Sequence, residues 1–298
     1  MSVIKEVFEN LWTHYADRVS DAKTIELALK TRKDAWVEDH VAFRTFPGAH
    51  TGAHVLQKMF ELLGFKRCDD YFFEDKQLKA FWMEPPHNDK TLCHEAAPKI
   101  FISELILDKF SSDFQNIIKT HAAQVKSNPL PLLKKLLNEN NSAEFVTEFS
   151  TYLTQKPAWA RPVFSDYEIL RKQSEYAAWT LVFGSCVNHF TVSVQLMKTF
   201  SSLSDLNQFI KDELKIPMNE SGGVIKGTAA VGLEQSSTLA SVVQVYFQDG
   251  FKNLPYAFIE FAFRHPLQDR KSDGVWDSYY QCFVVNNADK IFESTNAR

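Results

Sequence analysis

The chain has few cysteines, no basic run and no long apolar stretch. Its four cysteines are scattered and form no C-x-x-C pair, which is typical of reduced thiols, so we expect a cytoplasmic protein. The net charge is −4 with the two signs interspersed, so nucleic-acid binding has no electrostatic support. No run approaches the roughly 18 apolar residues of a membrane span, and charges interrupt residues 1–19, where a signal peptide would need an apolar core. We therefore expect neither a nucleic acid nor a membrane as partner.

Motifs of several common enzyme classes are also missing. No serine lies in a G-x-S-x-G motif, which removes the main hydrolase signature. Residues 221–228, SGGVIKGT, hold glycines and a lysine but not in the G-x-x-x-x-G-K-[ST] order of a phosphate-binding loop. His50 and His54 have helical spacing, but no glutamate follows the first histidine as in the zinc motif H-E-x-x-H.

Material for a hydrophobic core is abundant. Apolar residues make up 45% of the chain and aromatic residues 13%, which excludes a disordered chain. Apolar residues recur at three- and four-residue steps over residues 3–15, so we expect a helical amino terminus. Residues 108–175 carry helical periodicity with Asn, Pro and Ser breaks, and are predicted to be a helical insertion.

Two further stretches share one order of elements: strand, helix and three strands. The expected elements of the first are 40–46, 54–65, 66–75, 78–85 and 99–107. Those of the second are 188–196, 202–214, 222–235, 240–248 and 256–264. We predict an α+β fold in one catalytic domain, 1–298, with a curved sheet. Its parts are a helical amino terminus (1–35), a first βαβββ module (36–107), the insertion (108–175), and a second module with the carboxy-terminal segment (176–298).

Three of the predicted strands carry single ionisable residues beside small ones on one face. Because side chains alternate along a strand, residues two apart share a side. His40 and Arg44 share a face of the opening strand, and His189 and Glu260 hold similar positions on two later strands. Solvent-facing strands usually carry many polar residues, so isolated ionisable groups beside alanine favour the concave side of a curved sheet.

A bound cation would explain these residues. Leaving a buried charge without its partner costs roughly 3–5 kcal/mol, and a cation shared by His40, His189 and Glu260 would satisfy all three. Two imidazoles and one carboxylate with open positions form the facial triad of non-haem Fe(II) oxygenases, although Zn, Ni or Mn can enter such sites. Each residue alone could be a hydrogen-bonded structural side chain, but equivalent placement in two modules favours the metal.

Arg44 is the candidate for binding a substrate. It lies about 6.5–7 Å beyond His40 along the strand, so its planar guanidinium could hold a carboxylate of a molecule bound at the metal. The alternative is an ion pair with Glu38 or Asp39.

Two more residues are candidates at the same site. Arg264 stands in the same relation to Glu260 as Arg44 does to His40, so it is a secondary substrate-binding candidate. Glu104 is expected to be the counterpart of Glu260 in the first module. It could be a fourth ligand, but a structural hydrogen bond is the simpler interpretation.

Four stretches of the sequence resemble a known family. The stretches DHVAFRTF, NHFTVSV, YAFIEFAFR and ADKIFEST are similar to those of the 2-oxoadipate dioxygenase/decarboxylase family, which belongs to the vicinal-oxygen-chelate superfamily. The resemblance implies paired βαβββ modules that form a metal-holding cup. It also implies His40, His189 and Glu260 as iron ligands and Arg44 as the substrate-binding arginine.

The same resemblance implies a reaction. The substrates would be a 2-oxo dicarboxylic acid, 2-oxoadipate, and O₂, and the products 2-hydroxyglutarate and CO₂, as in lysine catabolism. A residue of the carboxy-terminal segment would also contact the substrate, and Val285 and Asn286 are the nearest candidates.

Two alternatives stay open at this point. One is a redox-neutral isomerase or lyase of glyoxalase type that uses zinc or nickel on the same scaffold. The other is a non-catalytic module that binds a small ligand. The sequence gives no indication of the oligomeric state.

Overall fold

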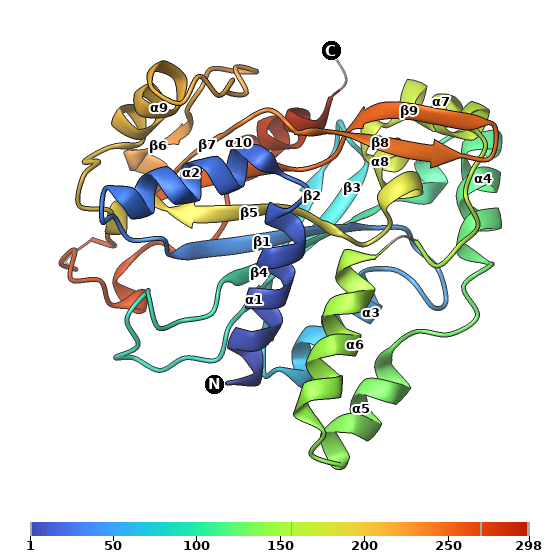
Figure 1. Cartoon of the computed structure of the whole chain (residues 1–298), viewed down its shortest axis with the longest axis horizontal. Helices are drawn as coiled ribbons and strands as arrows, with labels where there is room; N and C mark the ends of the chain where they lie inside the picture. The colour runs from blue at the N-terminus through green and yellow to red at the C-terminus, as the bar shows by residue number, and fades with distance from the viewer. Residues whose placement is uncertain (1, 156, 269, 297–298) are drawn as a thin grey trace.

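The fold is organised around one eight-stranded mixed sheet that curls into a half-barrel (Figure 1). The computed structural model describes residues 2–155, 157–268 and 270–296. The strand order is β2-β3-β4-β1-β5-β10-β7-β6. The strands are β1 (Glu38–Thr45), β2 (Lys66–Phe73), β3 (Leu78–Glu84), β4 (Lys99–Leu105), β5 (Val187–Ser193), β6 (Lys226–Thr228), β7 (Leu233–Ser237) and β10 (Phe258–Arg264). The predicted α+β class is confirmed.

The helices precede, separate and follow these strands along the chain. They are α1 (Val3–Ala16), α2 (Ser20–Thr31), α3 (Ala53–Leu62), α4 (Ser112–Ala122), α5 (Leu130–Asn138), α6 (Ser142–Thr154), α7 (Phe164–Gln173), α8 (Glu175–Phe183), α9 (Leu203–Asp212) and α10 (Val285–Ile291). Short 3-10 helices are η1 (Leu107–Lys109), η2 (Val194–Leu196), η3 (Ala229–Val231), η4 (Trp276–Ser278) and η5 (Phe292–Thr295). Within the described ranges, no helix is long and apolar enough to cross a membrane.

The first half of the sheet follows the predicted order. β1 leads into α3, and then β2, β3 and β4 complete one edge. Helix α3 ends just before Gly64, whose φ of +87° is accessible to glycine at little cost. Phe43 of β1 and Phe60 of α3 are fully buried, with ring centroids 5.5 Å apart. Burying one such ring contributes roughly 1.5–3 kcal/mol, so these contacts help fix the helix against the sheet.

The second half departs from the prediction in two places. Residues 222–235 do not form one strand, because β6 and β7 are separated by η3. Residues 240–248 were predicted as a strand of the module, which is wrong: β8 (Val242–Phe247) pairs only with β9 (Gly250–Pro255) in a separate two-stranded sheet. This hairpin lies beside α7 and α8 (Figure 1). The last strand of this half is β10, as expected.

The two halves join through β1 and β5. These central strands pair antiparallel, while β4 runs parallel to β1 and β10 runs parallel to β5. Each half therefore repeats the other in strand order, outwards from the same central pair. His40 and Arg44 lie on β1, His189 lies on β5, and Glu260 lies on the neighbouring strand β10.

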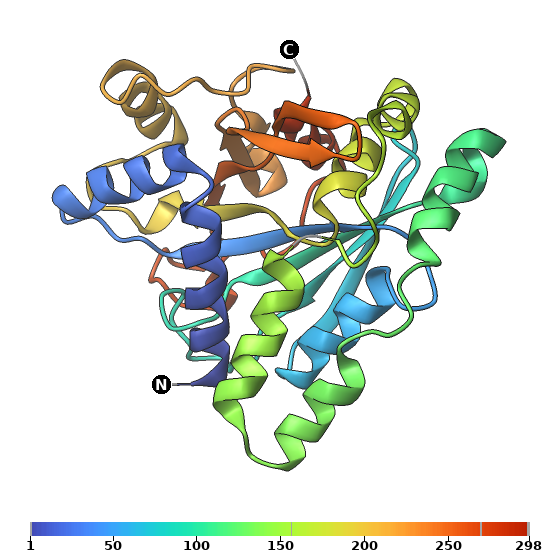
Figure 2. The same cartoon turned by 45° about the vertical axis from the view of Figure 1, so that its right-hand side comes forward.

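Helices pack around the sheet and against each other. α1 lies along α6 in both views, although the two are far apart in sequence (Figure 2). The predicted helical insertion is present, but helices continue through α8 to Phe183. α8 is buried along its whole length, and it packs against β1.

Candidate metal centre

The two histidines and the glutamate meet at the centre of the sheet. One ligand atom from each of His40, His189 and Glu260 lies within 4.8 Å of the others, and all three residues are buried. The Nε2 atom of His189 lies 3.1 Å from Oε2 of Glu260, and Nε2 of His40 lies 3.7 Å from Oε1. The structure brings these predicted residues together, and the triad suggests a metal site. Their individual roles as ligands stay a prediction.

A β-bulge comes just before each triad histidine. The pairing of β1 with β5 skips Asp39 on one strand and Asn188 on the other, and such bulges re-aim side chains. Asp39 Oδ1 lies 2.8 Å from Nδ1 of His40, and Asn188 Oδ1 lies 3.0 Å from Nδ1 of His189. An oxygen facing Nδ1 favours the proton on that atom, which gives each Nε2 a lone pair that can bind a cation; at His40 this lone pair faces the hydroxyl of Thr191.

The electrostatics favour the protonation states that bind metals. Burial opposes the ionised form of Glu260, but its interactions with His40 and His189 and the hydrogen bond from Gln235 outweigh burial, so the pKa of Glu260 lies below its ordinary value. Burial also lowers the pKa of His189, although Glu260 partly opposes this. An ionised carboxylate and a neutral imidazole are the forms that coordinate a metal.

The hydrogen bonds at the triad leave room for one more partner. Gln235 Nε2 donates to Oε1 of Glu260 at 2.6 Å, and Thr191 Oγ1 lies 3.0 Å from Nε2 of His40. Oε2 of Glu260 is buried and faces Nε2 of His189 at 3.1 Å, which carries a lone pair when the ring proton is on Nδ1. Two facing acceptors repel each other, whereas a cation between them would satisfy both. The residues therefore fit a divalent metal.

Arg44 lies on the same strand as His40 and is almost fully buried. Its Nη2 donates to Thr295 Oγ1 at 3.0 Å and to the Phe292 carbonyl at 3.5 Å, while its Nε has no partner. The rings of Tyr176 and Trp179 lie 5.2 and 5.1 Å from the guanidinium carbon. Burial lowers the pKa of Arg44 to about 10, so it is still charged at neutral pH.

No carboxylate pairs with Arg44 among the described residues. The alternative partners considered from the sequence, Glu38 and Asp39, form no ion pair with it; Asp39 pairs with Arg264 instead. A buried guanidinium without an acid is costly, and an anionic ligand would offset that cost.

A small cavity connects the triad and Arg44. Its free volume is about 20 Å³. Apolar walls come from Phe101 of β4 and from Phe283, Ile291 and Phe292 of the carboxy-terminal segment. The Phe283 ring meets the His40 ring edge-on, with centroids 4.8 Å apart. The carboxy-terminal segment therefore covers the candidate site.

Arg264 is committed to other partners. Its Nε and Nη2 bind the Asp39 carboxylate at 2.6 and 2.9 Å. Its Nη1 donates to the carbonyls of Tyr280 and Cys282 at 3.0 and 2.9 Å. This placement is a physical argument against the predicted contact with substrate, because the guanidinium already holds a carboxylate and two carbonyls.

Glu104 does not occupy the position expected of it. In the strand register His189 is opposite Phe258 and His40 is opposite Lys99, so the counterpart of Glu260 is Phe101. Glu104 Oε2 instead accepts from the backbone N–H of Ala53 at 2.8 Å, at the start of α3. Its Oε1 lies 2.8 Å from Nζ of Lys79. Glu104 is thus a structural acceptor in this fold.

The carboxy-terminal candidates lie away from the cavity. Val285 and Asn286 begin α10 and are exposed. Ala288 and Ile291 are the α10 residues that line the cavity. The predicted substrate contacts of Val285 and Asn286 therefore have no support in this structure, because α10 directs other residues inward.

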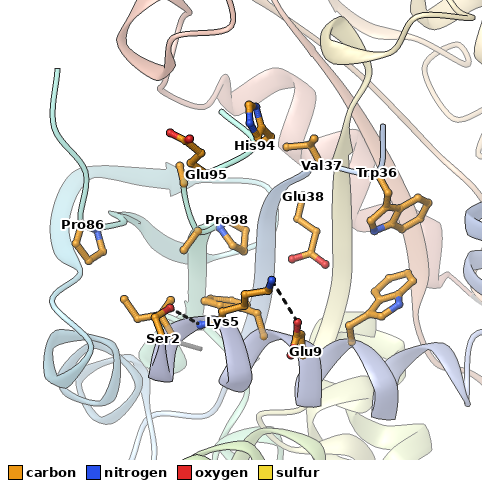
Figure 3. A pocket seen from close by; sticks show the side chains of 15 residues that line it. Ser2, Lys5, Glu9, Trp36, Val37, Glu38, Pro86, His94, Glu95 and Pro98 are labelled. Atoms are coloured by element: carbon orange, nitrogen blue, oxygen red, sulfur yellow. Dashed lines mark hydrogen bonds and ion pairs between the residues drawn. The ribbon is translucent and has the colours of Figure 1, made fainter. Parts of the chain in front are cut away.

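A larger hollow lies elsewhere, between α1 and the loop before β4 (Figure 3). Its volume is about 640 Å³, and Lys5, Glu9 and Glu38 are among its lining residues. Burial and the nearby carboxylates raise the pKa of Glu38 to about 8. None of the predicted site residues lines this hollow, so it is separate from the triad.

Sequence reasoning missed several residues of the site. Asp39 and Asn188 orient the histidines, Gln235 binds Glu260, and Phe283 covers His40. One signal could have found the first two, since each module opens with an Asp-His or Asn-His pair. Gln235 and Phe283 reach the site only through tertiary folding.

Comparisons with known proteins show the family to which the chain belongs. A model of the 2-oxoadipate dioxygenase/decarboxylase family matches residues 4–281. The chain is 35% identical to the chloroplastic/amyloplastic 2-oxoadipate dioxygenase/decarboxylase of Oryza sativa, over 99% of this chain and 79% of that protein. That protein's name assigns it to plastids, so the cytoplasmic location expected from the cysteines stays a prediction.

Solved structures are similar as well. The hydroxyglutarate synthase of Oryza sativa in complex with 2-oxoadipate has a TM-score of 0.80 and 34% identity, covering 97% of this chain and 90% of that one. A putative glyoxalase superfamily protein of Ralstonia eutropha has a TM-score of 0.72 at 20% identity, covering 88% and 82% of the two chains, which indicates a similar fold. The chain belongs to the 2-oxoadipate dioxygenase/decarboxylase family.

Proposed function

We propose that this chain is an Fe(II)-dependent dioxygenase that converts 2-oxoadipate and O₂ to 2-hydroxyglutarate and CO₂. Membership of the family makes it an oxygen-dependent, decarboxylating enzyme. The observation that carries the proposal is a buried His40–His189–Glu260 triad that shares a cavity with the unpaired Arg44. The reaction balances, with both atoms of O₂ retained in the two products.

The domain assignment is part of the same proposal. The two halves of the sheet would be a pair of vicinal-oxygen-chelate modules within one catalytic domain spanning 1–298. The repeated strand order around β1 and β5 supports this assignment. So does the similarity of fold to a glyoxalase superfamily protein.

The triad would hold the iron, and its partners would keep it ready to bind. Asp39 and Asn188 orient His40 and His189, while Gln235 orients Glu260. A facial triad leaves about three positions of an octahedral ion open. When bound, Fe(II) would supply a site for the 2-oxo acid and for the activation of O₂.

Arg44 would hold a substrate carboxylate. Its buried charge and free Nε suit an anion, and its planar donors match a carboxylate in two places. The apolar walls formed by Phe101, Phe283 and Ile291 would exclude water from the reacting carbon. Excluding water strengthens the pull of Arg44 on the carboxylate, because the local dielectric constant is low.

Oxygen consumption tests this function directly. The purified protein is stripped of metal, reconstituted with Fe(II) without oxygen, and then assayed for O₂ uptake with 2-oxo acids of increasing length. We expect uptake and CO₂ release to be greatest with 2-oxoadipate, and the Zn(II)-loaded protein should show neither. Turnover of a 2-oxo acid without O₂ uptake would instead identify the isomerase or lyase. Binding without turnover would identify a ligand-binding module.

A further inference from the structure

The two triad histidines are oriented by residues of different charge. His40 is held by an aspartate and His189 by an asparagine, and both partners sit at equivalent bulges. Either side chain offers an oxygen to Nδ1, so orientation of the ring requires only that oxygen. The second atom of each side chain, a carboxylate oxygen or an amide nitrogen, is where the two partners differ.

The surroundings of the two partners explain the difference in charge. The second oxygen of Asp39 faces Arg264 at 2.6 Å and Lys99 at 3.8 Å. The two hydrogen bonds from Arg264 compensate the buried negative charge of Asp39. Asp39 lines a different small hollow from the triad cavity, so its charge faces away from the substrate.

Asn188 lies on the substrate side. It lines the triad cavity together with Arg44, and its bulge is opposite the step from Ala42 to Phe43, just before Arg44 on β1. Asn188 is 1% exposed, and its Nδ2 has no hydrogen-bond acceptor. The Nε of Arg44 is likewise buried and has no hydrogen-bond acceptor. Buried donors normally have an acceptor, so an acceptor-rich ligand group would satisfy both of these.

We propose that Asn188 is a specificity-determining residue whose Nδ2 donates to the same substrate carboxylate that Arg44 binds, while its Oδ1 orients His189. This inference rests on the proposed function and adds a second contact to the carboxylate remote from the metal. A carboxylate has about four lone-pair sites and can accept from both groups at once. An aspartate at position 188 would still orient His189, but it would repel the substrate carboxylate and compete with it for Arg44.

The matched substitution is Asn188→Asp, because Asp39 performs the same orienting role in the other half. The assay compares 2-oxoadipate with 2-oxohexanoate, which has the same chain length but lacks the remote carboxylate. Like charges brought together in a buried site cost several kcal/mol. We therefore expect kcat/KM for 2-oxoadipate to fall roughly 100-fold, with each 1.4 kcal/mol worth about tenfold. The preference for 2-oxoadipate over 2-oxohexanoate should fall by a similar factor.

Metal binding provides the second readout. Titration of the apo proteins with Co(II), followed by visible absorption, should give Asn188→Asp an affinity within about threefold of wild type, because the acceptor for His189 is retained. Asn188→Leu removes both the acceptor and the donor. It should weaken Co(II) binding by roughly 10–100-fold and also reduce the preference for the dicarboxylic acid.

Two outcomes would overturn the inference. The first is an unchanged preference in Asn188→Asp, whether kcat/KM falls equally with both substrates, which would mean a purely structural role, or does not fall at all. The second is an unchanged preference in Asn188→Leu, which decides the matter if the aspartate variant does not fold. A wild-type protein that consumes no O₂ with either acid would contradict the proposed function instead, so the two failures are distinguishable.

Discussion

Arg264 donates two hydrogen bonds to the Asp39 carboxylate, Nε to Oδ2 at 2.6 Å and Nη2 to Oδ1 at 2.9 Å, and both residues are almost fully buried. Asp39 in turn orients His40. The remaining donors of Arg264 bind the carbonyls of Tyr280 and Cys282, next to the ring of Phe283 that covers the triad. One arginine therefore connects the candidate metal centre to the carboxy-terminal segment that covers it.

Replacing this arginine should destabilise the fold. In Arg264→Met the buried carboxylate of Asp39 loses its main partner, and breaking a buried pair in this way costs about 3–5 kcal/mol. Urea unfolding of the apo protein should show a loss of this size. If stability is unchanged and only the KM for 2-oxoadipate rises, the sequence-based assignment of Arg264 to substrate binding is correct after all.

The double variant Asp39→Asn/Arg264→Met is the matched control. It removes both charges but keeps an oxygen for His40, as Asn188 provides for His189. We expect it to be more stable than Arg264→Met alone, because an uncompensated charge is no longer buried.

If the triad holds the metal, substitution of a triad residue should abolish metal binding, and substitution of a histidine elsewhere should not. His189→Ala removes one of the three proposed ligands and leaves Glu260 with fewer partners, so Fe(II) or Co(II) bound per chain should fall from near one to near zero. His54→Ala, at an exposed position on α3, should bind metal normally. Metal content is measured by elemental analysis after reconstitution. Full occupancy in the His189 variant would mean that the ion is held elsewhere.

Arg44 should affect the substrate and not the metal. Arg44→Ala leaves the triad intact but removes a cavity guanidinium that has no acid partner, so kcat/KM for 2-oxoadipate should fall by roughly 30- to 4,000-fold, from the 2–5 kcal/mol that such contacts carry. Arg44→Lys keeps the charge without the planar fork and should fall between wild type and alanine. A variant that loses iron but keeps its substrate preference would contradict this role.

Much of this site follows from the sequence, because strand periodicity is a local property. The alternation in β1, β5 and β10 predicts which side chains share a face, and the repeated element order predicts that the faces meet. His40, His189 and Glu260 accordingly converge. Residues 66–75 and 78–85 form the expected hairpin, β2 and β3.

Other features depend on which strands pair and in what register. The alternation of apolar and polar side chains along one strand does not specify either. Residues 240–248 alternate like a sheet strand, yet β8 pairs with β9 outside the main sheet. Strict alternation would turn Asp39 and Asn188 away from the site, and only the bulges bring them to the histidines. Helix α8 is apolar on all sides, so it shows no helical stripe by which it could be recognised.

Substitutions of Glu104 test the strand register, which gives the position equivalent to Glu260 to another residue. Its carboxylate accepts from the Ala53 N–H at the start of α3, beside Gly52, where a Cβ would come within 2.7 Å of Glu104 Oε2. Glu104→Leu would leave that buried N–H unsatisfied, so we expect a loss of about 1–3 kcal/mol in urea unfolding with unchanged metal content. Glu104→Gln keeps an acceptor and should be close to wild type in both measurements. Since Phe101 holds the position equivalent to Glu260, loss of metal from the glutamine variant would mean that Glu104 reaches the ion and that the strand register is not the one described.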